Sequence, residues 1–174
     1  FDTFVTDHPC EARLVIVGER FWWDQRMEDA WKRMKHQDRV HFTGRLGQDR
    51  LRLAMGGAHA LAFISYFEGF GIPVAEAMRC GVPVIAADAT SLPEIAGDAA
   101  HYCDPFSVAD ITRVLYDVWF DPALCEQLRK AGLKRAQRYS WDNAAKGLWA
   151  SFERMCADAG LGLRKKSTGD PATS

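Results

Sequence analysis

The sequence lacks the features by which membrane-spanning and nucleic-acid-binding proteins are usually recognised. No apolar run approaches the roughly 18 residues needed to cross a bilayer, and no signal-peptide pattern opens the chain. The formal net charge is −1, so the composition offers no electrostatic attraction for nucleic acid or for an anionic membrane surface. We therefore predict a cytoplasmic protein that binds no nucleic acid.

Metal and disulfide patterns are missing as well. The histidines show no metal-ligand spacing, and the cysteines are scattered, with no Cys-x-x-Cys pair. The cysteines are Cys10, Cys80, Cys103, Cys125 and Cys156. An odd, dispersed set of this kind is typical of small buried apolar residues in a reducing compartment. The sequence thus predicts neither disulfides nor a metal ion, and no bound cofactor.

The length and composition are those of one globular domain. The chain has 174 residues, of which 48% are hydrophobic and 26% charged. From about residue 157 the composition turns to Gly, Ser, Thr, Lys and Pro, which is typical of a flexible tail. We predict a domain over 1–156 and a tail over 157–174. The chain begins with Phe1 instead of methionine, so we expect it to be part of a longer protein.

Short apolar segments alternate with longer helical patterns, which is typical of a parallel sheet covered by helices. The segments expected to form strands are 14–17, 40–43, 60–64, 82–86 and 101–103. The first is a continuous apolar run that ends at a glycine, as expected for a strand buried on both faces. The predicted fold class is therefore α/β, a Rossmann-like doubly wound parallel sheet of about five strands with helices on both faces.

Several helix ends can be placed from their capping residues. Pro73 and Gly81 fit the first turn of a helix over 72–79 and the position just past its end. Ser91 and Glu94 have the spacing of a capping box for one helical turn. Three longer helices are expected to close the domain, over about 107–120, 121–138 and 140–156.

The segment 65–78 carries the chemistry, because it follows a strand and opens a helix. Open α/β sheets bind ligands at such turns. Gly69 and Gly71 flank Phe70, so the backbone can approach a ligand closely. The N–H groups of Gly71 and Ile72 would point out of the helix start, where the helix dipole also favours a phosphate.

Two carboxylates border this predicted phosphate site. Glu68 lies just before the helix, and Glu76 lies one turn into it. Carboxylate oxygens accept hydrogen bonds from the hydroxyl groups of a ribose or a hexose. A phosphate site beside two carboxylates is the arrangement expected for a sugar nucleotide. Glycines are also common at strand-to-helix turns that bind nothing, so the residues alone leave a purely structural interpretation open.

The run EGFGIPVAEAM, with a Glu-x7-Glu spacing from Glu68 to Glu76, resembles the signature of retaining glycosyltransferases with the GT-B fold (glycosyl transferases group 1). The segments 80–86, 91–100 and 139–141 are also similar to that family. The resemblance covers about 14–152. It implies that this chain is the C-terminal, donor-binding half of such an enzyme.

The resemblance also assigns roles to residues. It implies that Glu76 holds the ribose hydroxyls and that Glu68 contacts the donor sugar near the reacting carbon. The backbone N–H groups of Gly69, Phe70 and Gly71 would face the sugar and the diphosphate. The turn after the second expected strand resembles the loop that lies against the base. Its residues are Thr43, Gly44, Arg45 and Leu46.

The sequence departs from the family pattern in two respects. Ile64 stands where the family usually has proline. The family's arginine and lysine that neutralise the diphosphate lie in a strand and helix that would precede residue 14, and this sequence does not contain them. It also lacks the N-terminal domain that binds the acceptor. The resemblance therefore implies most of a donor site and no acceptor site.

The function that the resemblance implies is sugar transfer from a nucleoside-diphosphate sugar to a polysaccharide, a lipopolysaccharide or another glycoconjugate. Peripheral membrane association of the full-length protein is also expected. No Asp-x-Asp occurs, so metal-independent catalysis is expected, with the helix dipole and cationic side chains stabilising the leaving group. Two alternatives stay open, a nucleotide-binding module without transferase activity and a sugar-nucleotide epimerase.

Overall fold

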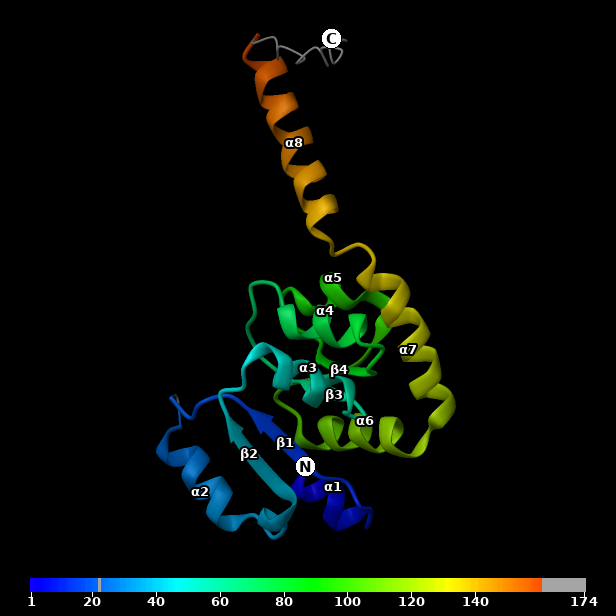
Figure 1. Ribbon diagram of the computed structural model, residues 1–174. Coiled ribbons are helices and arrows are strands. Elements are labelled where there is room, and N and C mark those ends of the chain that lie inside the picture. Colours follow the sequence, from blue (N-terminus) through cyan, green and yellow to red (C-terminus); the bar gives the residue numbers. More distant parts are fainter. Residues whose placement is uncertain (22, 161–174) are drawn as a thin grey trace, which may run out of the picture. The chain divides into compact units, whose positions relative to one another are not determined.

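The computed structural model describes residues 1–21 and 23–160. The chain divides into two compact units, Phe1–Gln137 and a second unit that begins at Arg138. The first unit contains all the strands among the described residues, and the second contains the helix α8 (Trp141–Asp158). Figure 1 shows the elements along the chain. The end of the predicted tail, residues 161–174, lies outside the described part.

All strand pairs are parallel, as the alternation of elements predicts. Strand β1 (Leu14–Val17) pairs with β2 (Val40–Gly44), and the order in the other sheet is β3 (Leu61–Phe63), β4 (Val84–Ala87), β5 (Ala100–Cys103). The α/β fold class is thus confirmed. The strands hydrogen-bond in two sheets, however, and not in one sheet of five. Each crossover β1–β2, β3–β4 and β4–β5 joins neighbours, whereas β2 and β3 do not pair.

The helices alternate with these strands. In the first unit of the described chain the α-helices are α1 (Asp2–Asp7), α2 (Gln25–Arg33), α3 (Gln48–Gly56), α4 (Ile72–Arg79), α5 (Leu92–Ala96), α6 (Val108–Phe120) and α7 (Pro122–Ala136). Short 3-10 turns, η1 (Gln37–Arg39) and η2 (Gly97–Ala99), precede β2 and β5. The capping residues and spacing in the sequence predicted α4, α5, α6 and α7, whereas no prediction was made for α1, which has only six residues.

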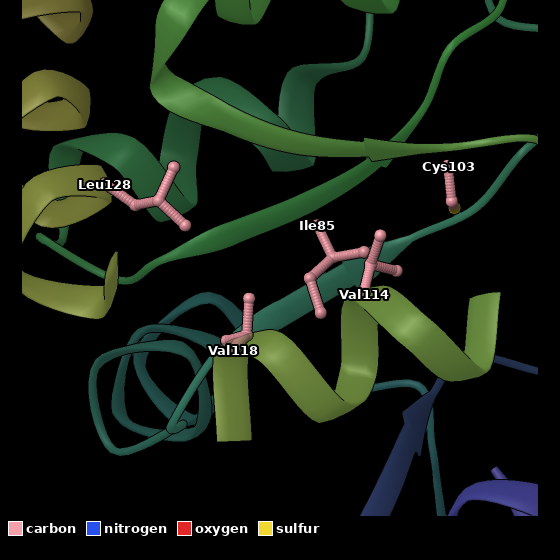
Figure 2. Packing of buried hydrophobic residues seen from close by; sticks show 5 residues of the cluster. All are labelled: Ile85, Cys103, Val114, Val118 and Leu128. Atoms are coloured by element: carbon pink, nitrogen blue, oxygen red, sulfur yellow. The ribbon is translucent and has the colours of Figure 1, made fainter. Parts of the chain in front are cut away.

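Helices cover both faces of the β3–β4–β5 sheet. Helix α4 packs on β3 and β4 from one side together with α5 and α7, and α6 packs on β4 and β5 (Figure 1). Every residue of β4 is buried, as expected for the central strand of a doubly covered sheet. Figure 2 shows the cluster formed by side chains of β4, β5, α6 and α7. Its buried members are Ile85, Cys103, Val114, Val118 and Leu128.

The helix caps confirm most, but not all, of the predicted boundaries. Helix α4 begins at Ile72 with Pro73 in its first turn, and Gly81 follows its end with φ of 69°. Ser140 accepts a hydrogen bond from the N–H of Asn143, which caps α8 at the predicted start of the last helix. The predicted capping box at the start of α5 is wrong. The hydroxyl of Ser91 makes no capping bond there and reaches a residue 23 positions earlier in the chain.

Helix α8, described by itself, is 18 residues long and carries an apolar stripe at helical spacing. The large side chains of the stripe are exposed, with Trp141 91% and Trp149 59% accessible. The others are Leu148, Phe152 and Met155. No helix of the described chain, α8 included, is long and apolar enough to cross a membrane.

Candidate functional site

The loop between β3 and α4 is the candidate site that the sequence singles out. The side-chain hydroxyl of Ser65 donates to the carbonyl of Phe67, 3.1 Å away, which bends the chain just after the strand. Gly71 then caps α4 in the left-handed region, with φ of 94°. Its carbonyl accepts from the N–H groups of Val74 and Ala75. The loop therefore turns into the helix at Gly71.

A side chain at position 71 would be excluded on two grounds. A φ of 94° is unfavourable for any residue with a Cβ. An ideal Cβ at Gly71 would also lie 2.6 Å from Cδ2 of Leu92, whose side chain is fully buried. The left-handed turn and its close contact with α5 thus both require glycine here.

The start of α4 offers backbone donors to a ligand. Pro73 has no N–H, and the N–H groups of Val74 and Ala75 already bond to Gly71. The N–H groups of Gly71 and Ile72 are therefore the candidate donors of this turn. They lie at the positive end of the helix dipole, which favours an anion such as a phosphate.

The two carboxylates sit on this loop and helix. Glu68 is partly buried in the loop, and Glu76 is exposed as the fifth residue of α4, one turn after the helix begins. Phe70 and Ile72, between them, are 43% and 62% exposed. The structure thus places the predicted residues from Glu68 to Glu76 on one continuous segment, of which Phe70, Ile72 and Glu76 are exposed and Gly71 is buried.

The backbone of Glu68 is held by residues that the sequence did not point to. Its N–H donates to the hydroxyl of Thr90 at 3.1 Å, and its carbonyl accepts from the hydroxyl of Ser91 at 3.0 Å. Both partners lie in the turn between β4 and α5. The only available signal was position, because polar residues at the carboxyl end of a parallel strand often line a site.

The second predicted segment, 43–46, lies at the end of β2. The hydroxyl of Thr43 donates to the carbonyl of Gly44 at 2.8 Å, and the N–H of Arg45 donates to a carboxylate oxygen of Glu19 at 3.2 Å. An open depression is lined by 45–50, at the start of α3. This segment follows the β1–β2 sheet, and Arg45 bonds to Glu19 in the loop after β1. The loop that contains Glu68 bonds instead to the turn between β4 and α5.

The loop after β1 contains a further cation that the sequence did not single out. The guanidinium of Arg20 lies 3.7 Å from the centre of the Phe42 ring and 4.8 Å from that of Trp23. Trp23 in turn donates to the carboxylate of Glu28 at 2.9 Å. These contacts fix Arg20 near the end of the β1–β2 sheet, beside Glu19.

Histidines and cysteines do not assemble into a reactive cluster. No group of three or more His, Cys, Asp or Glu side chains suited to a metal ion occurs within residues 1–21 and 23–160. His36 pairs with Asp2, and His101 pairs with Asp117. The five cysteines are free, but the prediction that they are buried holds fully only for Cys103, where burial raises the pKa of the thiol to about 11.

Comparison with known proteins gives the family context. The chain is 33% identical over 139 residues to the O-antigen chain mannosyltransferase B of Escherichia coli, an alignment that covers 78% of this chain and 36% of that protein. It is 36% identical over 114 residues to the serotype-specific mannosyltransferase WbdA of Escherichia coli, covering 66% of this chain and 14% of that protein. The chain thus spans about a third or less of the curated relatives it matches.

Solved structures show the same fold. Sucrose-phosphate synthase from Thermosynechococcus elongatus superposes with a TM-score of 0.76 at 25% identity, over 90% of this chain and 41% of that one. Anabaena HepE, solved with UDP and glucose, gives a TM-score of 0.77 at 19% identity, over 88% of this chain and 43% of that one. Residues 7–135 match the model of glycosyl transferases group 1, and the chain therefore belongs to that family.

Proposed function

We propose that this chain is the donor-binding domain of a retaining glycosyltransferase that takes a sugar from a nucleoside-diphosphate sugar. The observation that carries the proposal is the EGFGIPVAEAM segment, which lies where a strand of a parallel sheet leads into a helix. Its glycine turn begins the helix between two carboxylates, with Glu68 before the turn and Glu76 one helical turn after it. That combination suits a diphosphate flanked by sugar hydroxyls.

Each group then has a role in the proposed site. Glu76 accepts hydrogen bonds from the ribose hydroxyls, and Glu68 contacts the donor sugar near its reacting carbon. The N–H groups of Gly69, Phe70, Gly71 and Ile72 face the sugar and the diphosphate. Departure of the diphosphate is assisted by the helix dipole and by cationic side chains, without a metal ion. The segment 43–46, with its depression, lies against the base.

The relatives indicate which donors to try first. Two of them are named mannosyltransferases, and one structural neighbour was solved with UDP and glucose. We propose that the full-length protein acts in the cytoplasm on a polysaccharide, a lipopolysaccharide or another glycoconjugate, reached by peripheral membrane association where the acceptor is lipid-linked. The acceptor would bind to a domain outside these residues.

The test is sugar transfer by the full-length protein, with GDP-mannose and UDP-glucose offered separately. Glu68→Gln should lower the rate about 10- to 150-fold, the range for lost hydrogen bonds to a charged group. Glu11→Gln, at an exposed glutamate outside the donor segment, serves as the matched control. Proton NMR of the product should show the anomeric configuration of the donor retained.

The same assay separates the alternatives. Binding of nucleotide without transfer would favour a binding module. Conversion of the free donor into its epimer, without an acceptor, would favour an epimerase. Transfer with inversion would contradict the retaining mechanism while leaving the donor-binding role intact.

A further inference from the structure

The turn between β4 and α5 makes two hydrogen bonds to Glu68 in the loop between β3 and α4, which we call the donor loop. Thr90 accepts from the N–H of Glu68 at 3.1 Å, and Ser91 donates to its carbonyl at 3.0 Å. Leu92 follows directly, and its buried side chain packs against Gly71. Two residues of the turn and the first residue of α5 thus contact the loop that contains Glu68.

Thr90 takes an unfavourable backbone conformation in this turn. Its φ is 50°, and among the described residues it is the one non-glycine with positive φ. The left-handed region is especially unfavourable for a β-branched side chain. Thr90 is also exposed, so burial of its methyl group does not explain the conformation. Such conformations persist where the surrounding structure fixes them, and they cluster at functional sites.

Protein folding alone does not demand these two hydrogen bonds. Thr90 is exposed, and Glu68 and Ser91 are only partly buried. Water could therefore satisfy the backbone groups of Glu68 at little cost. What water cannot do is fix both the N–H and the carbonyl of one residue in space. Fixing both sets the direction of the Glu68 Cα–Cβ bond, and hence the starting point of its carboxylate.

We propose that Thr90 and Ser91 are positioning residues, which hold the Glu68 carboxylate in the geometry needed for sugar transfer. This inference rests on the proposed function, since it gives a second turn the task of orienting the carboxylate of the donor site. Loss of either hydroxyl should lower turnover through Glu68, without removing any group that contacts the nucleotide.

The experiment uses the full-length protein and three variants. Thr90→Ser keeps the hydroxyl, Thr90→Gly removes it and relieves the backbone strain, and Ser91→Ala removes the second hydroxyl. Amide hydrogen exchange of the segment around Glu68 is measured by mass spectrometry, and thermal unfolding by calorimetry. The values of kcat and KM are measured with whichever donor supports transfer in the assay of the full-length protein.

The expected pattern separates positioning from stability. Thr90→Gly and Ser91→Ala should each speed exchange around Glu68 roughly 2- to 12-fold, as loss of one hydrogen bond predicts. Both should lower kcat more than they raise KM, while Thr90→Ser stays near the wild type. Thr90→Gly should unfold at the same temperature as the wild type or higher, because the strain is gone.

Other outcomes would overturn the inference. Faster exchange with unchanged kcat would show that the two hydrogen bonds to Glu68 do not contribute to the transfer step, and the proposed function would stand. If Thr90→Gly lowers the unfolding temperature as well as kcat, the role of Thr90 is merely structural. A wild-type protein that neither binds nor transfers from a nucleoside-diphosphate sugar would remove the proposed function, and this inference with it, whatever the exchange data show.

Discussion

At the scale of single residues, Glu76 allows the most direct test of donor binding. Its side chain is exposed on α4, so its removal leaves no cavity and no unsatisfied buried group. Glu76→Ala in the full-length protein should weaken nucleotide binding by about 1–3 kcal/mol, the cost of losing hydrogen bonds to a charged acceptor. Isothermal titration calorimetry with UDP and with GDP measures this difference.

The matched control for Glu76 is Glu94→Ala. Glu94 is exposed on the neighbouring helix α5 but lies outside the donor segment. It should leave both titrations unchanged. If Glu76→Ala binds the preferred nucleotide as tightly as the wild type does, Glu76 is not the ribose ligand.

At the scale of elements, the junction of the donor loop with α4 depends on Gly71. Gly71→Ala should destabilise the first unit by about 1 kcal/mol or more from the positive φ alone. The contact of 2.6 Å between a Cβ and Leu92 adds to that cost, because Leu92 is fully buried and cannot move aside freely. Chemical denaturation with the equilibrium slope checked for two-state behaviour gives the difference.

Gly69→Ala is the control for this element. Gly69 has no positive φ, and an added Cβ there would meet no atom within 4 Å. The unfolding free energy of this variant should stay within about 0.5 kcal/mol of the wild type, as is usual for surface substitutions. A Gly71→Ala variant as stable as Gly69→Ala would contradict the strained turn.

The elements show which parts of the structure a sequence can predict. Helix α4 was predicted with its observed ends because the residues that mark them are local in sequence, with Pro73 in the first turn and Gly81 just past the end. Ser91 was misassigned because its partner is 23 residues away in sequence, while the nearby Glu94 imitated a capping box. The positive φ of Thr90 gave no sequence signal at all, because threonine rarely adopts it.

At the scale of the whole molecule, parallel pairing was predictable because each apolar segment is followed by a helical pattern. The division into two sheets was not, because strand neighbours across the chain depend on packing that no local pattern encodes. The candidate site, too, was predictable only where a local pattern encodes it. The segment from Glu68 to Glu76 was found as one motif in the sequence. The hydrogen bonds from Glu68 to Thr90 and from Arg45 to Glu19 join segments that are distant in the sequence, so no local pattern predicted them.

The last prediction concerns what this chain can do by itself. The matched part of the chain covers 36% of a related mannosyltransferase and 41% of a structural neighbour, so we expect the acceptor site to lie in other parts of the full-length protein. The apolar stripe of α8 is consistent with a helix that is covered in the longer protein. The isolated chain should therefore fold, bind UDP or GDP weakly at best, and transfer no sugar.

The measurement compares the isolated chain with the full-length protein under the same conditions. Circular dichroism and thermal unfolding first establish that the isolated chain folds cooperatively, so that inactivity cannot be blamed on misfolding. Radiolabelled donor and acceptor are then supplied to both. Because the acceptor is proposed to bind to a domain outside these residues, this chain can hold the donor but cannot bring the acceptor hydroxyl to it. Robust transfer by the 174-residue chain alone would show that it already contains an acceptor site, and the division of labour proposed here would fall.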